Sequence, residues 1–114
     1  MSELPPILNQ EEGLKRVGGN KSLYKRLLGM YVANNYMSQL TVELSSGDLA
    51  AAQTTAHSIK GLAANLSMIR LHQTALALET CLKTGQPYDD AFSAVIAVTG
   101  ETMAATQELI AALG

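Results

Sequence analysis

The chain has little of what secreted, membrane-spanning and nucleic-acid-binding proteins depend on. Its 114 residues include one cysteine, three prolines, no tryptophan and only 4% aromatic residues. A single cysteine permits no internal disulfide, which suits a cytoplasmic location. No hydrophobic run approaches the roughly 20 residues that cross a bilayer. A net charge of −2 provides no basic excess for nucleic acid. We therefore expect a cytoplasmic protein without membrane or nucleic-acid contacts.

The residue composition favours a small, purely helical domain. Hydrophobic residues make up 47% of the chain and aromatics only 4%, so the core must be aliphatic. The few prolines and the lack of alternating β-branched residues favour helices over strands. A length of 114 residues suffices for one core, so we expect a single domain over residues 1–114. The predicted fold class is all-α.

Capping residues and glycines divide the chain into five predicted helices. These span residues 9–17, 20–44, 48–66, 70–83 and 89–112. Short loops between alanine-rich helices favour an antiparallel up-down-up-down four-helix bundle over residues 20–112, with the short helix 9–17 as a lid. Apolar stripes are predicted to consist of Leu23, Leu27, Tyr31 or Met30, Met37, Leu40 and Leu44 in the second helix, and of Leu71, Ala75, Leu78 and Leu82 in the fourth.

The helix predicted over residues 48–66 carries two different faces. Its apolar stripe, at helical spacing, consists of Ala56, Ile59, Ala63 and Leu66. A second face, at i, i+3, i+4 and i+7, consists of His57, Lys60, Gly61 and Ala64. Gly61 costs the helix about 1 kcal/mol relative to alanine, which is tolerable where another surface must come close. The spacing therefore predicts an exposed histidine on a nearly bare face.

The same segment matches a known type of sequence motif. It reads His57-Ser58-Ile59-Lys60-Gly61, followed by Ala63, Ala64, Asn65 and Leu66. This pattern resembles the phospho-acceptor motif of histidine-containing phosphotransfer (Hpt) domains of bacterial two-component phosphorelays. The resemblance covers about the whole chain and is most specific between Asp48 and Glu79. The chain departs from the usual pattern in Ser67-Met68, which replace a Gly-Ala pair, and in Leu62, which replaces a small residue.

The resemblance implies a role for each residue of the bare face. His57 would accept a phosphoryl group from the aspartyl phosphate of a response-regulator receiver domain and pass it to another receiver. Lys60 would stabilise the phosphoryl oxygens. Gly61, Ala64 and Leu62 would form part of the surface on which the receiver docks.

A hairpin register suggests which residue orients the histidine. If helices 48–66 and 70–83 form an antiparallel hairpin centred near Met68, positions whose numbers sum to about 136 lie side by side. His57 then lies beside Glu79. A carboxylate that accepts the Nδ1 proton leaves Nε2 with its lone pair free. In the family that the chain resembles, an acidic or amide side chain commonly orients the histidine, so we expect this role for Glu79.

Apart from the histidine, the sequence shows no machinery for phosphoryl transfer. It has no Gly-rich phosphate loop, no kinase-type ATP-binding motif and no acidic pair suited to Mg²⁺. We therefore expect a carrier protein that is not an enzyme and has no cofactor of its own. The partner receiver domain would supply the Mg²⁺. Response-regulator receivers and a hybrid sensor kinase are the expected partners, and the protein is expected to be a monomer.

Two alternatives to the receiver-to-receiver carrier stay open at this stage, and a third, a metal site, is disfavoured. The phospho-acceptor domain of a chemotaxis-type histidine kinase carries the same motif and takes its phosphoryl group from ATP. A structural helical adaptor would carry the histidine incidentally. A metal site would need His57, Glu79 and His72 together. In the hairpin register His72 lies opposite Ala64, roughly 10 Å along the axis from His57, so we predict no metal site.

Overall fold

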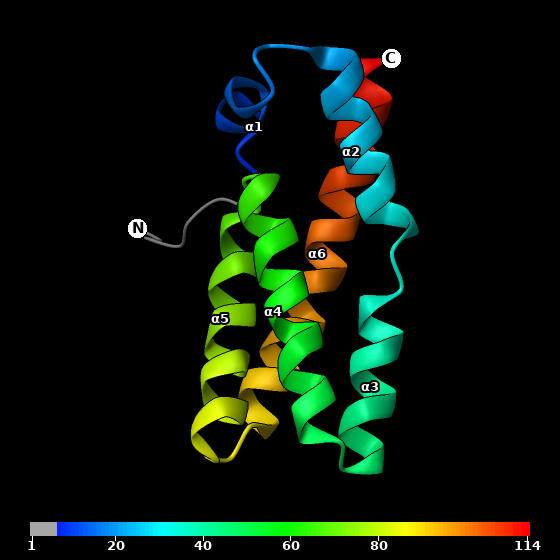
Figure 1. The fold of residues 1–114 in the computed structure, drawn as a ribbon. Helices are drawn as coiled ribbons and strands as arrows, with labels where there is room; N and C mark the ends of the chain where they lie inside the picture. The colour runs from blue at the N-terminus through cyan, green and yellow to red at the C-terminus, as the bar shows by residue number, and fades with distance from the viewer. Residues whose placement is uncertain (1–6) are drawn as a thin grey trace, which may run out of the picture.

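The computed structural model describes residues 7–114, and within this range every regular element is an α-helix (Figure 1). The predicted all-α class is thus confirmed. The described elements are α1 (Gln10–Arg16), α2 (Lys21–Ala33), α3 (Tyr36–Ser46), α4 (Leu49–Asn65), α5 (Ile69–Thr84) and α6 (Asp89–Leu113). Among the described residues, no helix combines the length and the apolar character needed to cross a membrane.

The long helices pack side by side as a helical bundle (Figure 1). The chain runs down α2 and α3, returns along α4, descends through α5 and rises again in α6. The most extensive contact is between α4 and α5; α3 packs against α4, and α6 packs against both α5 and α2. The short helix α1 lies at the end of the α4–α5 pair, where the Asn9 backbone N–H donates to the Ser67 carbonyl oxygen at 3.0 Å.

The single helix predicted over residues 20–44 is wrong, because the structure has two helices there. The chain leaves α2 at Asn34, which is extended (φ −70°, ψ 156°), and α3 begins at Tyr36. The Asn34 side chain donates from Nδ2 to the carbonyl oxygen of Tyr31 and accepts the backbone N–H of Tyr36 at 2.9 Å. One amide side chain therefore satisfies backbone groups on both sides of the break.

The buried face of α2 also differs from the predicted one. Tyr31 is buried as predicted, but it is joined by Tyr24 and Leu28. The predicted Leu23 and Leu27 are only half-buried, and Met30, the alternative to Tyr31, is 61% exposed. Two apolar stripes adjoin on this helix, and the one that carries both Tyr24 and Tyr31 turns inward because aromatic rings remove more surface from water. Tyr24 packs on Gly13 of α1, where an added Cβ would lie 2.5 Å from the tyrosine oxygen. Of the predicted residues in α3, Leu40 is buried, and Met37 and Leu44 are half-buried.

Helices α4 and α5 follow the prediction closely. α4 begins after Asp48, whose carboxylate accepts the Ala51 backbone N–H at 3.1 Å. α5 ends before Gly85, which adopts the left-handed conformation with φ 71°. All predicted core residues of the two helices are buried, namely Ala56, Ile59, Ala63, Leu66, Leu71, Ala75, Leu78 and Leu82. The alanines among them permit a close approach of the two helices.

The turn between α4 and α5 is built around Ser67. This buried serine has φ 57°, and it is the one non-glycine residue with positive φ in the described part of the chain. The N–H groups of Met68 and Ser67 donate to the carbonyl oxygens of Ala63 (2.9 Å) and Ala64 (3.2 Å), which closes the end of α4. The Ser67 hydroxyl donates to Oε1 of Glu12 in α1 at 3.2 Å. The helix α1 thus supports a turn in which the serine conformation costs about 1–2 kcal/mol.

We predict that Ser67→Gly gives a more stable protein than Ser67→Ala, by about 1 kcal/mol. Both substitutions remove the hydroxyl that contacts Glu12, but only glycine adopts the left-handed conformation without strain. Urea unfolding followed by circular dichroism measures the difference. Equal stability of the two variants, or a more stable alanine variant, would contradict the strain assigned to this turn.

Candidate functional site

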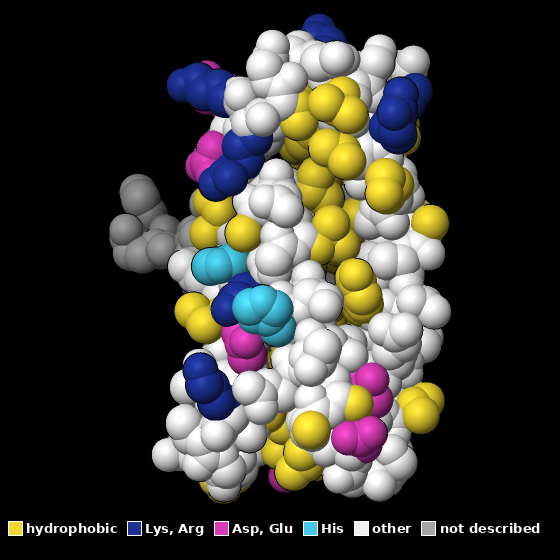
Figure 2. All heavy atoms as spheres, viewed as in Figure 1, with side chains coloured by type: hydrophobic (Ala, Val, Ile, Leu, Met, Phe, Trp, Pro, Cys, Tyr) yellow, Lys and Arg dark blue, Asp and Glu magenta, His cyan; other side chains and the backbone are white. Residues whose placement is uncertain are grey.

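His57 lies near the middle of α4 on its exposed face. Its side chain is 65% exposed, while the apolar stripe of the same helix is buried in the core. In Figure 2 the two histidines of the chain lie close together on this face, next to a basic and an acidic side chain. The predicted exposure of the histidine is therefore confirmed.

Glu79 of α5 contacts two side chains of α4. Its Oε2 lies 2.8 Å from Nδ1 of His57, and its Oε1 lies 2.7 Å from Nζ of Lys60. The Glu79 side chain is only 13% exposed. The hairpin register, which predicts Glu79 beside His57, is therefore confirmed. A second pair of the same register, Ala64 and His72, lines one shallow depression.

The charges around Glu79 decide which ring nitrogen of His57 carries the proton and which has an available lone pair. The ion pair with Lys60 lowers the pKa of the Glu79 carboxyl; desolvation opposes this, and the hydrogen bond with His57 lowers the pKa further. Glu79 therefore stays ionised at neutral pH and can only accept hydrogen bonds. The contact between Oε2 and Nδ1 then requires a proton on Nδ1. A neutral imidazole in this tautomer has its free lone pair on Nε2.

Lys60 lies about one helical turn from His57, with its ammonium group on the other oxygen of Glu79. Its side chain is 23% exposed, so the cation lies at the edge of the exposed face. An ammonium group has three donor hydrogens, and the ion pair with one carboxylate oxygen uses one of them. The arrangement places a cation with remaining donor capacity close to the imidazole.

The three residues predicted to form a docking surface differ in exposure. Gly61 is exposed, and no atom lies within 4 Å of the place where a Cβ would stand. Ala64 and Leu62 are half-buried. Leu62 packs against the core and lines a cavity at the break between α2 and α3. Packing within the molecule therefore does not require a glycine at position 61.

The second histidine is placed differently from the first. His72 is half-buried and lines the shallow depression together with Glu12 and Ala64. Within residues 7–114, no group of three or more His, Cys, Asp or Glu side chains is positioned to hold a metal ion.

The break next to Leu62 is the feature of the site's surroundings that the sequence analysis missed. The signal was the pair Asn34-Asn35, because asparagine competes for backbone hydrogen bonds and favours helix ends over helix interiors. The continuous apolar spacing on both sides of this pair concealed the signal.

Among protein-family models, that of the Hpt domain matches residues 30–113, which include α4, α5 and the contact between His57 and Glu79. Neither the curated proteins nor the solved structures give a significant match.

We predict that Glu79 sets the tautomer of His57. Nitrogen-15 NMR of the imidazole should show mainly the Nδ1–H form in the wild type. In Glu79→Ala the population should move toward Nε2–H, because Nδ1 loses its acceptor. Glu79→Gln, which keeps an acceptor oxygen, should lie between the two. As a control, Glu101→Ala removes an exposed carboxylate of α6 and should leave the tautomer unchanged. An unchanged ratio in Glu79→Ala would mean that this carboxylate is only a surface charge.

Proposed function

The chain belongs to the Hpt domain family, and on this premise we propose that His57 accepts a phosphoryl group from the aspartyl phosphate of one receiver domain and passes it to another. Hpt domains are histidine phosphotransfer carriers of two-component systems and interact with receiver domains. The observation that carries the proposal is the hydrogen bond between Glu79 and Nδ1 of an imidazole that is 65% exposed. This geometry presents Nε2 to a partner.

The transfer step uses the lone pair of Nε2. As Nε2 attacks phosphorus, the N–P bond forms and the P–O bond to the aspartate breaks, so the aspartate leaves as a carboxylate. Nδ1 keeps its proton throughout, and the ring of the product carries positive charge. The ionised Glu79 beside Nδ1 stabilises that charge. The reverse step transfers the phosphoryl group to the second receiver without net uptake or release of a proton.

Lys60 has the role of stabilising the phosphoryl oxygens in this proposal. Its ammonium group is anchored on Glu79 about one turn from His57, and its remaining donors are available to an anion bound at Nε2. The Mg²⁺ that neutralises the transferring group belongs to the receiver domain. The chain itself then acts as a carrier and not as an enzyme, and needs no cofactor.

The receiver docks over Gly61, Ala64 and Leu62. A glycine inside a helix costs about 1 kcal/mol relative to alanine. Because no neighbour in the molecule occupies the space above Gly61, a partner can approach the helix backbone closely at this position. A receiver backbone that approaches this position brings its aspartyl phosphate close to Nε2.

We also propose how the helices around this site are arranged. The long helices form an antiparallel up-down-up-down four-helix bundle, in which α2 and α3 together take one position, and α1 is a lid over one end of the α4–α5 pair. We take the protein to be a cytoplasmic monomer, with a hybrid sensor kinase as a further partner.

We predict that His57→Gln abolishes phosphorylation without loss of the fold, because an amide cannot form the N–P bond. His72→Gln is the matched control and should accept phosphate at the wild-type rate. Both variants are mixed with phosphorylated receivers, and acid-labile phosphate on the protein is measured. Phosphorylation of His57→Gln, or its loss only in His72→Gln, would contradict the proposal. If pathway output does not change in His57→Gln, the protein is a helical adaptor.

We predict that Gly61→Glu slows phosphotransfer at least tenfold while its melting temperature stays at or above that of the wild type. Glutamate favours the helix by somewhat under 1 kcal/mol relative to glycine, but it obstructs the approach of the receiver. Gly100→Glu is the matched control, since Gly100 of α6 is also exposed and also has no atom within 4 Å of a Cβ position. The Gly100→Glu variant should accept the phosphoryl group at the wild-type rate. A steep loss of stability in Gly61→Glu with normal transfer would identify Gly61 as a packing residue.

A further inference from the structure

Five of the eight Lys and Arg residues of the chain lie between positions 15 and 26, a segment that contains no acidic residue. Two of them belong to α1 and three to the first half of α2. They form what we call the basic cluster: Lys15, Arg16, Lys21, Lys25 and Arg26. Lys25 is half-buried and the other four are exposed. Because the whole chain has a net charge of −2, this concentration of positive charge is local.

The three cations of α2 are not explained by contacts inside the molecule. Among residues 7–114, Arg16 pairs with Glu12 at 3.2 Å, whereas Lys21, Lys25 and Arg26 form no ion pair. The first turn of α2 has no acidic residue, although the helix dipole favours acidic residues over cations there. Neither ion pairing nor the helix dipole therefore accounts for these cations. Unpaired surface charge of one sign suits a partner surface of the opposite sign.

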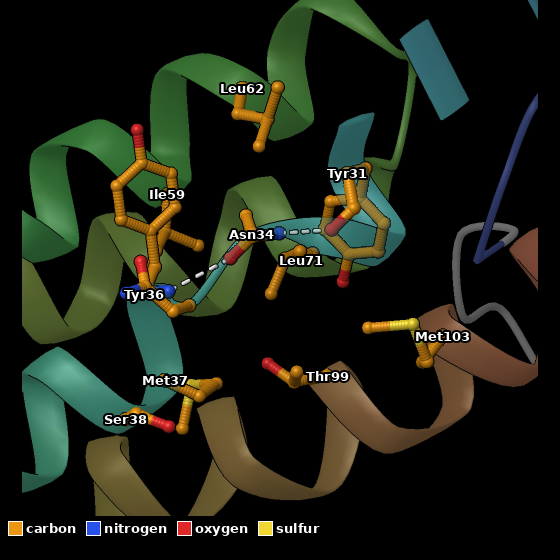
Figure 3. Close-up of a pocket in the computed structure, with 11 residues that line it drawn as sticks. Tyr31, Asn34, Tyr36, Met37, Ser38, Ile59, Leu62, Leu71, Thr99 and Met103 are labelled. Carbon is orange, nitrogen blue, oxygen red and sulfur yellow. Dashed lines mark hydrogen bonds between the residues drawn. The ribbon is translucent and has the colours of Figure 1, made fainter. Parts of the chain in front are cut away.

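The basic cluster borders the face that carries His57. The helix α2 approaches α4 at the break, where Tyr31 and Leu62 line one cavity (Figure 3), and α1 lies at its other end (Figure 1). In Figure 2 most basic side chains of the face with the histidines lie in its upper part. A standard interface covers about 800 Å² per partner, which corresponds to a radius of roughly 16 Å. Since α4 extends only about 12 Å beyond His57, a partner docked on the imidazole reaches the end with the basic cluster.

Acidic residues predominate at the opposite end of the bundle, where α3 ends and α4 and α6 begin (Figure 1). They are Glu43, Asp48, Asp89 and Asp90, with Lys83 as the one Lys or Arg among the described residues there. The end with the basic cluster also holds Glu11, Glu12 and Glu108, but its cations outnumber them. An acidic partner surface is attracted to one end and repelled from the other, so charge favours a single orientation of the partner.

The basic cluster suits an acidic protein better than a membrane. Helices that lie on membranes combine their cations with large apolar side chains that enter the lipid. The exposed large apolar residues of the described chain are Met30, Val42, Leu49, Leu76 and Ile96, and none of them lies between positions 15 and 26. The phosphoryl site of a receiver is itself anionic, because carboxylates hold its Mg²⁺.

On the premise of the proposed function, we propose that the basic cluster selects and orients receivers whose surface beside the aspartyl phosphate is acidic. Lys21 and Arg26 attract that surface before contact, so that the aspartyl phosphate arrives at Nε2 of His57. They take no part in making or breaking bonds, and they act on association alone. Attraction of this kind raises association rates by about 10- to 1,000-fold and weakens as salt screens the charges.

The test measures phosphotransfer from a phosphorylated receiver to the full chain at about 10 mM and about 1 M salt, where the Debye lengths are about 30 Å and 3 Å. At low salt, Lys21→Glu/Arg26→Glu should lower kcat/KM at least tenfold through a higher KM, with kcat unchanged. At high salt, this variant and the wild type should converge. The fold should be kept, because Lys21→Glu places an acidic residue in the first turn of α2, and thermal melting checks this.

Lys83→Glu is the matched control, since Lys83 is exposed, forms no ion pair among the described residues and lies at the opposite end. It should keep the wild-type kcat/KM at both salt concentrations. The single variant Arg26→Glu changes the net charge equally and should lower kcat/KM about threefold at low salt. If the double variant does not fold, the comparison of these two single variants decides.

The possible outcomes separate this inference from the proposed function. Equal transfer to the wild type and to Lys21→Glu/Arg26→Glu, a loss in kcat instead of KM, or an equal loss in Lys83→Glu would overturn the inference and leave phosphotransfer at His57 intact. No transfer to the wild type from any receiver would overturn both. Vesicles of anionic phosphatidylglycerol that bind the wild type but not the double variant, with transfer unchanged, would assign the cluster to a membrane and also overturn the inference.

Discussion

The close pairing of α4 with α5 is the constraint on which the remainder of the structure depends. Glu79 meets His57 and Lys60 only because the two helices are held in one register, in which positions summing to about 136 face each other. A slip of one residue would rotate Glu79 by about 100° away from the imidazole. The buried alanines of both helices permit the approach, and the Ser67 turn fixes the register at its end. The distant helix α1 contributes to the site through this turn, since Glu12 and Asn9 both bond to Ser67.

The site combines burial and charge in a way that neither helix could provide alone. A carboxylate that is 13% exposed would ordinarily tend to become protonated, and a protonated Glu79 could not serve as a pure acceptor. Lys60 prevents this because its ammonium group lies 2.7 Å from Oε1. Both contacts of Glu79 come from successive turns of α4, so the same helix carries the imidazole and the cation that keeps its partner ionised. His57 can therefore be exposed to a partner and still be held in one tautomer.

The helices that could be predicted from the sequence are those with a single apolar stripe at helical spacing and clear capping residues. In α4 and α5, small and aliphatic residues form one stripe each, and Asp48 and Gly85 mark the start of α4 and the end of α5. These features predict the antiparallel register of the two helices and therefore the position of Glu79 beside His57. In α2 two apolar stripes adjoin, and the spacing alone does not show that the one with Tyr24, which packs on Gly13, is buried. The break at Asn34 depends on side-chain hydrogen bonds to Tyr31 and Tyr36, which helical spacing does not reveal.

Leu62 connects the exposed site with the break and its cavity. A small residue at this position would leave the cavity wider and the surface next to Gly61 flatter. With leucine, the side chain packs against the core, lines the cavity beneath the break and is half-buried. The break between α2 and α3 is thus close to the part of α4 that follows His57, since Leu62 and the break line one cavity.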